Sequence, residues 1–170
     1  MSKDDVLARV DADLARGLVH PAMQRLASLT ATHPDDLDVR ARRAALNRQI
    51  GNLVEAGRWG YLTEEVTSAE ITAFGRAHRS AWAQLLALKL RDDPTEHLGP
   101  LAHRRFTGLV ERAAAEGSPA SISWSDAGPH REVAMTWRDS LPCLIAALIG
   151  LLLIGLIIVG LVTVVRLIIT

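Results

Sequence analysis

The chain has 170 residues, and its 19 basic and 19 acidic residues give a formal net charge of zero at pH 7. This balance argues against a general nucleic-acid-binding surface, because such surfaces are strongly basic. The lone cysteine, Cys143, excludes an intramolecular disulfide and a cysteine-based metal site.

Apolar residues at helical spacing predict seven helices in the first 116 residues. Ser2 and Asp5 have the spacing of a capping box at the first helix, and Gly17 ends it. The next helices are expected over about 21–32, over 37–50 after a cap at Asp35 or Asp36, and over 53–65. A short helix follows a cap at Thr67 or Ser68, and two more are expected around 82–90 and over about 98–116. No segment alternates like a sheet, and only 4% of the residues are aromatic, so the sequence predicts an all-α soluble domain over residues 1–116.

The composition changes after residue 116. Residues 117–130 are rich in Ser, Gly, Pro and Ala, which is typical of a linker. Ile122 and Trp124 alternate with serines, but a lone strand there would have no partner. We therefore expect residues 117–138 to be a linker with a juxtamembrane segment.

The C-terminal segment is strongly apolar. No residue from Leu141 to Val165 is charged, and about 20 such residues are enough to cross a bilayer as a helix. The sequence therefore predicts a single transmembrane helix over residues 139–166, and no signal peptide precedes the helical domain. We expect a single-pass tail anchor in the cell membrane, with the N-terminal domain on the cytoplasmic side.

Two features stand out within this apolar run, a pair of small residues and the lone cysteine. Ala146 and Gly150 form a small-xxx-small pair, a pattern that supports contact between helices in membranes, although such pairs are also common by chance. The pair makes a homo-oligomer a candidate assembly. Cys143 is interpreted as an apolar filler, with acylation near the interface as the alternative.

The helices contain a candidate repeat. Gly17 and Ala22 recur as Gly51 and Ala56, and both offsets match the tetratricopeptide period of about 34 residues. We therefore expect two antiparallel tetratricopeptide-like helical hairpins over residues 3–68. The alternative is a non-repetitive helical bundle in which the coincidence arose by chance. Polar residues stand where the repeat usually has hydrophobic ones: Arg9, Asp13, Arg43 and Asn47.

The N-terminal half also resembles a family of functionally uncharacterised actinobacterial proteins. The residues that carry the likeness are Val6–Leu14 (VLARVDADL), Gln24-Arg25-Leu26, Ala56–Leu62 (AGRWGYL), Glu64-Glu65 and Ala73-Phe74. The likeness covers about residues 3–90 and does not include the C-terminal apolar run. It implies a fold and a lineage, and it implies no activity.

The chain contains none of the common catalytic and cofactor motifs. GxxxxGK[ST], GxGxxG, HExxH, CxxC and GxSxG are all absent. His97 and His103 are six residues apart, which places them on nearly opposite sides of a helix. The sequence therefore predicts a protein that is not an enzyme and has no cofactor and no metal.

One basic cluster is the candidate partner-binding site. Arg40, Arg43 and Arg48 lie on one expected helix, the first helix of the second hairpin, and such helices line the concave groove of a tetratricopeptide array. These arginines could receive an acidic peptide or a carboxylate. The alternative is a solvated face balanced by neighbouring aspartates.

The predicted function is that of a membrane-anchored adaptor or scaffold at the cytoplasmic face, which binds a protein partner through its helical domain. The alternative is a small effector or immunity protein whose transmembrane helix self-associates. Neither function involves nucleic acid.

Overall fold

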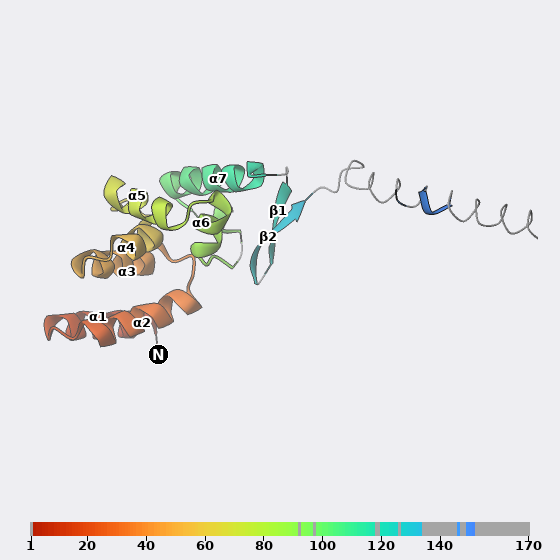
Figure 1. Cartoon of the computed structure of the whole chain (residues 1–170). Helices are drawn as coiled ribbons and strands as arrows, with labels where there is room; N and C mark the ends of the chain where they lie inside the picture. Colours follow the sequence, from red (N-terminus) through yellow and green to blue (C-terminus); the bar gives the residue numbers. More distant parts are fainter. Residues whose placement is uncertain are drawn as a thin grey trace, which may run out of the picture. The chain divides into compact units, whose positions relative to one another are not determined.

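The structure is a computed structural model, and it describes residues 2–91, 93–96, 98–117, 120–125, 127–133, 146 and 149–151. The chain separates into two units, residues 1–133 and 134–170. The first unit is mostly helical, as the sequence predicted, and ends in a small sheet (Figure 1). Its elements are α1 (Lys3–Ala15), α2 (Val19–Thr32), α3 (Leu37–Gln49), α4 (Leu53–Gly60), α5 (Ser68–Ala77), α6 (Ala81–Ala87), the 3₁₀ helix η1 (Pro94–Glu96), α7 (Pro100–Ala115), β1 (Ala120–Ser125) and β2 (Gly128–Val133).

The predicted fold class needs a correction at the C-terminus. In the part of the chain that the structure describes, no helix is both long and apolar enough to cross a membrane. The expected transmembrane helix over residues 139–166 is therefore not upheld, and the membrane-protein and tail-anchor assignments that rested on it are withdrawn. Hydropathy measures how apolar a segment is, and it does not establish that the segment forms one continuous spanning helix. Most of this range, with Cys143, lies outside the described residues.

The predicted helix caps are confirmed. Ser2 Oγ accepts a hydrogen bond from the Asp5 amide, and the Asp5 carboxylate accepts one from the Ser2 amide, so the capping box is closed. The Asp36 side chain caps α3, and Thr67 caps α5. Each cap satisfies amide groups in the first turn of its helix that have no partner within that helix.

Helix α4 ends at Gly60, before the end that the sequence predicted near residue 65. The chain turns there, with the Thr63 amide donating to the Gly60 carbonyl at 2.8 Å. Arg105 of α7 then donates to the carbonyls of Tyr61, at 3.2 Å, and Thr63, at 2.6 Å. These bonds satisfy carbonyl groups that a continued helix would have used, and the turn places Tyr61 and Leu62 in the core.

The first four helices repeat at a fixed interval. Helices α1 and α3 begin at Lys3 and Leu37, and α2 and α4 begin at Val19 and Leu53, so both pairs are offset by the same number of positions. The turns between them contain Gly17, with φ of 75°, and Gly51, with φ of 79°. Glycine adopts this left-handed conformation without the steric cost that a side chain would bring.

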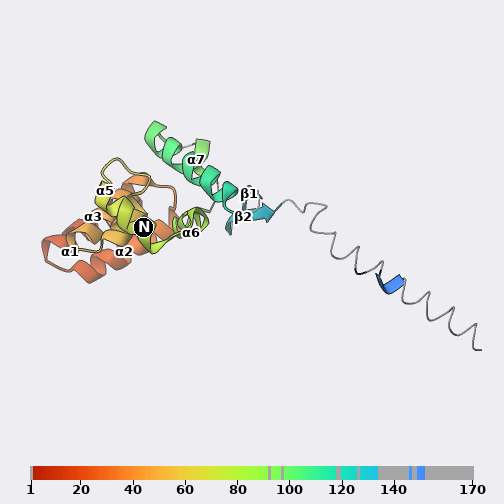
Figure 2. The same ribbon diagram turned by 45° about the horizontal axis from the view of Figure 1, so that its top comes forward.

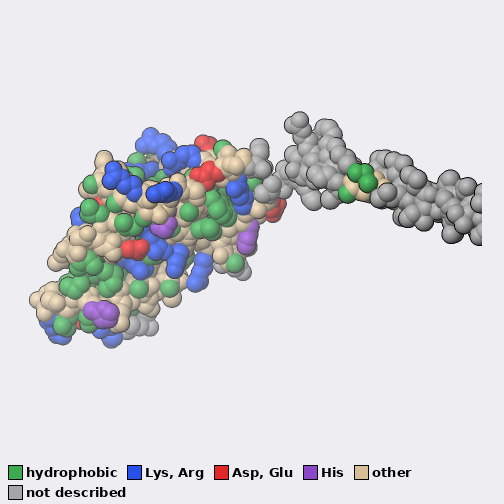
Figure 3. All heavy atoms as spheres, in the orientation of Figure 1, with side chains coloured by type: hydrophobic (Ala, Val, Ile, Leu, Met, Phe, Trp, Pro, Cys, Tyr) green, Lys and Arg blue, Asp and Glu red, His purple; other side chains and the backbone are tan. Residues whose placement is uncertain are grey.

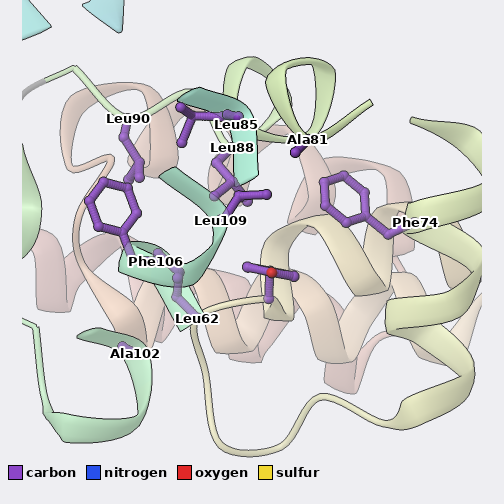
Figure 4. Packing of buried hydrophobic residues seen from close by; sticks show 11 residues of the cluster. Leu62, Phe74, Ala81, Leu85, Leu88, Leu90, Ala102, Phe106 and Leu109 are labelled. Atoms are coloured by element: carbon purple, nitrogen blue, oxygen red, sulfur yellow. The ribbon is translucent and has the colours of Figure 1, made fainter. Parts of the chain in front are cut away.

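Two hydrophobic clusters hold the helical domain together. One joins α1, α2 and α3, and its buried members are Leu7, Val10, Ala22, Leu26, Leu29, Val39 and Leu46. The other joins the turn after α4 to α5, α6 and α7, and Figure 4 shows its side chains converging. Its buried members include Leu62, Phe74, Leu85, Leu88, Phe106 and Leu109.

A β-hairpin forms within the segment that was expected to be a linker. Strands β1 and β2 are antiparallel, with Ile122 opposite Arg131 and Trp124 opposite Pro129. Figures 1 and 2 both show the hairpin beside the C-terminal end of α7, and the Trp124 and Phe106 rings are 5.5 Å apart. The partner strand contains Gly128 and Pro129 and has no apolar alternation, which is why the sequence did not reveal it.

Candidate functional site

A groove of about 680 Å³ lies among the helices and the β-hairpin of the first unit. It is lined by α2, α3, α4, the segment that follows α6, and the turn of the β-hairpin. Of the lining residues that the structure describes, the charged ones are all cationic: Arg43, Arg58, Lys89 and Arg91. We call this cavity the basic groove. Figure 3 shows a group of Lys and Arg side chains in the middle of this face, in the area between α2 and α6.

One wall of the basic groove is built on Trp59. The guanidinium carbon of Arg43 lies 3.7 Å from the centre of the Trp59 ring, and that of Arg58 lies 4.5 Å from it. Contacts of this kind between a cation and an aromatic face are attractive. Glu55 holds the wall from the side, because it accepts a hydrogen bond from Trp59 Nε1 at 2.8 Å and one from Arg58 Nη1 at 3.2 Å.

Arg43 is half-buried in this wall. Its Nη1 donates to Thr30 Oγ1, while its Nε is buried and has no hydrogen-bond partner among the described residues. Burial, followed by the neighbouring positive charge of Arg58, lowers the pKa of Arg43 to about 10. The guanidinium therefore stays charged at neutral pH, in an environment that would favour an incoming anion.

A second arginine lies beneath the basic groove. Arg40 is fully buried, and burial lowers its pKa to about 10. It donates to the Pro34 carbonyl at 2.7 Å and to the Leu88 carbonyl at 3.1 Å, while Arg58 Nε donates to the Ala87 carbonyl at 2.5 Å. Two cations thus hold the last carbonyls of α6, where the helix dipole favours positive charge.

The segment held in this way supplies another part of the groove lining. Lys89 follows Leu88 directly and has φ of 53°, the one positive φ at a non-glycine residue in the part of the chain that the structure describes. The Lys89 and Arg91 side chains are exposed, and neither forms a hydrogen bond or ion pair with a described residue. This segment therefore combines a left-handed backbone, of a kind that clusters at functional sites, with two cations that have no partner among the described residues.

The three arginines that the sequence singled out occupy different environments. Arg43 lines the basic groove, Arg40 supports it from below, and Arg48 lies elsewhere in an ion pair with Glu70 at 2.5 Å. The expectation was that α3 would line such a groove, but α3 supplies only Arg43, whereas α2 and α4 together supply Ala27, Thr30, Ala31, Arg58 and Trp59.

The other charged and aromatic residues of the basic groove were not predicted from the sequence. Arg58 and Trp59 stood in the AGRWGYL run as family markers, and Lys89 and Arg91 carried no motif. These residues come from segments far apart in the chain, so no local pattern could group them. The adjacent Arg-Trp pair was the available signal, because the two side chains combine charge with an aromatic face.

The other predicted site lies in the second unit. Ala146 and Gly150 are both helical, and no described atom lies within 4 Å of the position that a Cβ on Gly150 would take. Association through this pair stays a prediction.

Comparison with known proteins identifies the family of this chain. No curated protein and no solved structure matches it. The resemblance noted in the sequence covered about residues 3–90, whereas the family match extends over residues 1–166 and so includes the β-hairpin and the apolar run. The chain belongs to the family described as "Family of unknown function (DUF6584)".

Proposed function

We propose that this protein is a non-catalytic helical module that binds an acidic segment of a partner protein in the basic groove. The observation that carries this proposal is the one-sided charge of the groove, because the charged lining residues described are cations and two of them lack a described partner. Complementary charge steers association and selects partners. The volume of about 680 Å³ suits a few side chains of an extended segment.

The arrangement of the helices supports a binding role. The starts of the first four helices recur at the tetratricopeptide interval, and the turns at Gly17 and Gly51 each contain a left-handed glycine. Both features are typical of tetratricopeptide-like hairpins. Proteins built from stacked helical hairpins commonly bind partners across an extended surface. On this proposal, residues 3–60 form two such hairpins, and α5, α6 and the β-hairpin complete the groove.

The proposal is tested by measuring binding of a labelled Asp/Glu-rich peptide to the full chain by fluorescence anisotropy. The double variant Lys89→Glu, Arg91→Glu should bind at least about tenfold more weakly, because each reversal replaces attraction by repulsion in the groove. Added salt should weaken binding to the unaltered chain.

The matched control reverses two exposed cations away from the groove. Arg76 in α5 and Arg104 in α7 are exposed, and neither lines the groove. Arg76→Glu, Arg104→Glu makes the same change in net charge and should leave binding within about twofold of the unaltered chain. Equal losses in the two double variants would show that net charge, and not the groove, attracts the peptide, and the proposal would fail.

A second candidate function is self-association. A smaller hollow of about 370 Å³ is lined by Asp38, Glu64 and Glu65, among other residues, and its charge is opposite to that of the basic groove. A contact between this hollow and the basic groove of a second copy would be head-to-tail. Light scattering after size-exclusion chromatography tests this idea, because the Lys89→Glu, Arg91→Glu variant should then be monomeric where the unaltered chain is not.

A further inference from the structure

The basic groove holds more positive charge than its own carboxylates neutralise. Five cations surround it, counting Arg40 beneath the four that line it. The described carboxylates that act on them are Glu55, which bonds Arg58, and Asp35, whose charge acts on Arg40. The described residues thus leave a surplus of three positive charges, which a group carrying more than one negative charge would offset better than a single carboxylate.

The cations on the Trp59 wall are suited to a tetrahedral oxyanion. Arg43 and Arg58 are held against one ring, at 3.7 Å and 4.5 Å from its centre, so their planar groups have defined positions. Arg43 Nη1 bonds Thr30, and Arg58 Nε and Nη1 bond Ala87 and Glu55. The Nη2 group of each arginine has no hydrogen-bond partner among the described residues, and it is the charged donor left for a phosphate oxygen.

The segment after α6 is held in place by hydrogen bonds within the protein. Arg40 and Arg58 hold the carbonyls of Leu88 and Ala87, directly before Lys89. The left-handed backbone at Lys89 is therefore maintained by buried contacts, and it brings Lys89 and Arg91 to the groove in one short segment. A site whose donors are already in place loses less conformational entropy on binding.

Trp59 itself cannot serve as a stacking platform for a nucleobase. Only 3% of its surface is exposed, and three guanidinium groups lie within 5.3 Å of its ring centre. The face that a base would need is already covered, so a nucleotide gains nothing beyond its phosphate. The ligand chemistry is set by the cations and not by the aromatic ring.

We propose that the basic groove binds a phosphomonoester, presented as a phosphorylated serine or threonine of the partner segment. Arg43 and Arg58 contact it from the Trp59 wall, and Lys89 and Arg91 from the segment after α6. A phosphorylated side chain carries a charge of about −1.5 to −2 near neutral pH, which fits the surplus of the groove better than Asp or Glu does. This inference rests on the proposed function and specifies what the partner segment carries.

The experiment compares three versions of one labelled peptide against the full chain by fluorescence anisotropy. The versions carry serine, glutamate or phosphoserine at a single position in an otherwise identical sequence. The phosphoserine version should bind at least about tenfold tighter than the glutamate version, and Lys89→Ala and Arg91→Ala should each remove most of that difference. Arg76→Ala, an exposed cation outside the groove, is the control and should retain it. Equal thermal unfolding of the three variants would confirm that folding is unaffected.

The outcomes separate this inference from the proposed function. Equal binding of the glutamate and phosphoserine versions overturns the inference and leaves the acidic-segment proposal standing. Binding of inorganic phosphate with no binding of any peptide overturns the proposed function and assigns the groove to a small phosphorylated molecule.

Discussion

At the scale of single residues, the basic groove depends on side chains in unusual environments. Arg43 stands where a tetratricopeptide repeat usually has a hydrophobic residue, and it stacks on Trp59 at 3.7 Å instead. Arg40 is fully buried, and two carbonyls satisfy its terminal nitrogens. Buried arginines are costly unless they are bonded in this way. Their positions are therefore explained by what they hold in place, which is the wall of the groove.

The backbone of Lys89 provides the sharpest prediction at this scale. A non-glycine residue in the left-handed region costs about 1–2 kcal/mol, so Lys89→Gly should relieve strain while removing a cation. We expect its free energy of unfolding to be unchanged or up to about 1 kcal/mol higher, with weaker binding of the acidic peptide. Chemical denaturation and fluorescence anisotropy measure the two effects.

The control is Lys89→Ala, which removes the same cation and keeps the strained backbone. It should lose binding as Lys89→Gly does, without any gain in stability. If Lys89→Gly destabilised the protein more than Lys89→Ala does, the backbone at this position would not be strained, and the prediction would be wrong.

At the scale of elements, close approach of helices determines which residues are tolerated. Helices α4 and α5 come so near that a Cβ on Gly57 would lie 2.1 Å from the Glu70 carbonyl oxygen and 3.0 Å from Phe74 Cβ. Separation of the two helices would disturb Trp59, two positions along α4. The groove is thus linked to the packing of α4, which lines it, against α5, which does not.

Gly57→Ala should therefore lower the free energy of unfolding by about 1–3 kcal/mol, because the overlap outweighs the gain in helix propensity. Thermal or urea unfolding measures the change. The matched control is Gly108→Ala in α7, where a Cβ would meet no atom within 4 Å. That variant should be neutral or more stable by up to about 1 kcal/mol, and a similar loss in both variants would contradict the packing argument.

At the scale of the whole molecule, ion pairs and the β-hairpin join elements that are distant in sequence. Arg48 of α3 donates to the buried carboxylate of Glu70 in α5 at 2.5 Å and 3.0 Å. Trp124 of β1 contacts Phe106 of α7, and the turn of the hairpin supplies Ala127 and Pro129 to the groove. The hairpin is therefore part of the site as well as of the fold.

The Arg48–Glu70 pair predicts how stability depends on pH. Hydrogen bonds from Arg48 hold the pKa of Glu70 below its ordinary value of 4.5. The Glu70 carboxylate therefore binds a proton less readily in the folded state than in the unfolded state. Its contribution to the free energy of unfolding is present above pH 4.5 and is lost as the pH falls through the folded pKa. We expect Glu70→Gln to be less stable by about 1–2 kcal/mol at neutral pH and to lose less stability on acidification. Urea unfolding at several pH values measures both, and parallel pH profiles for the two proteins would refute the assignment.

Local signals in the sequence predict most of the helical fold. The caps at Ser2, Asp36 and Thr67 and the turns at Gly17 and Gly51 appear where the sequence placed them, because each depends on residues within one helical turn. The repeat interval was readable for the same reason, since the glycines that mark it lie in those turns. These features determined that the protein is mostly helical and where its first helices begin.

Tertiary structure alone decided the rest. The basic groove needs Arg43, Arg58 and Lys89 together, and only the packing of α3, α4 and α6 brings those positions to one cavity. Pairing of β1 with β2 depends on a partner strand that has no pattern of its own, and the early end of α4 depends on Arg105 from a distant helix. Which arginine reaches the groove and which is buried likewise depends on contacts between residues distant in sequence. Arg40 and Arg43 are one helical turn apart, yet Arg40 is enclosed by the neighbouring segments while Arg43 reaches the groove.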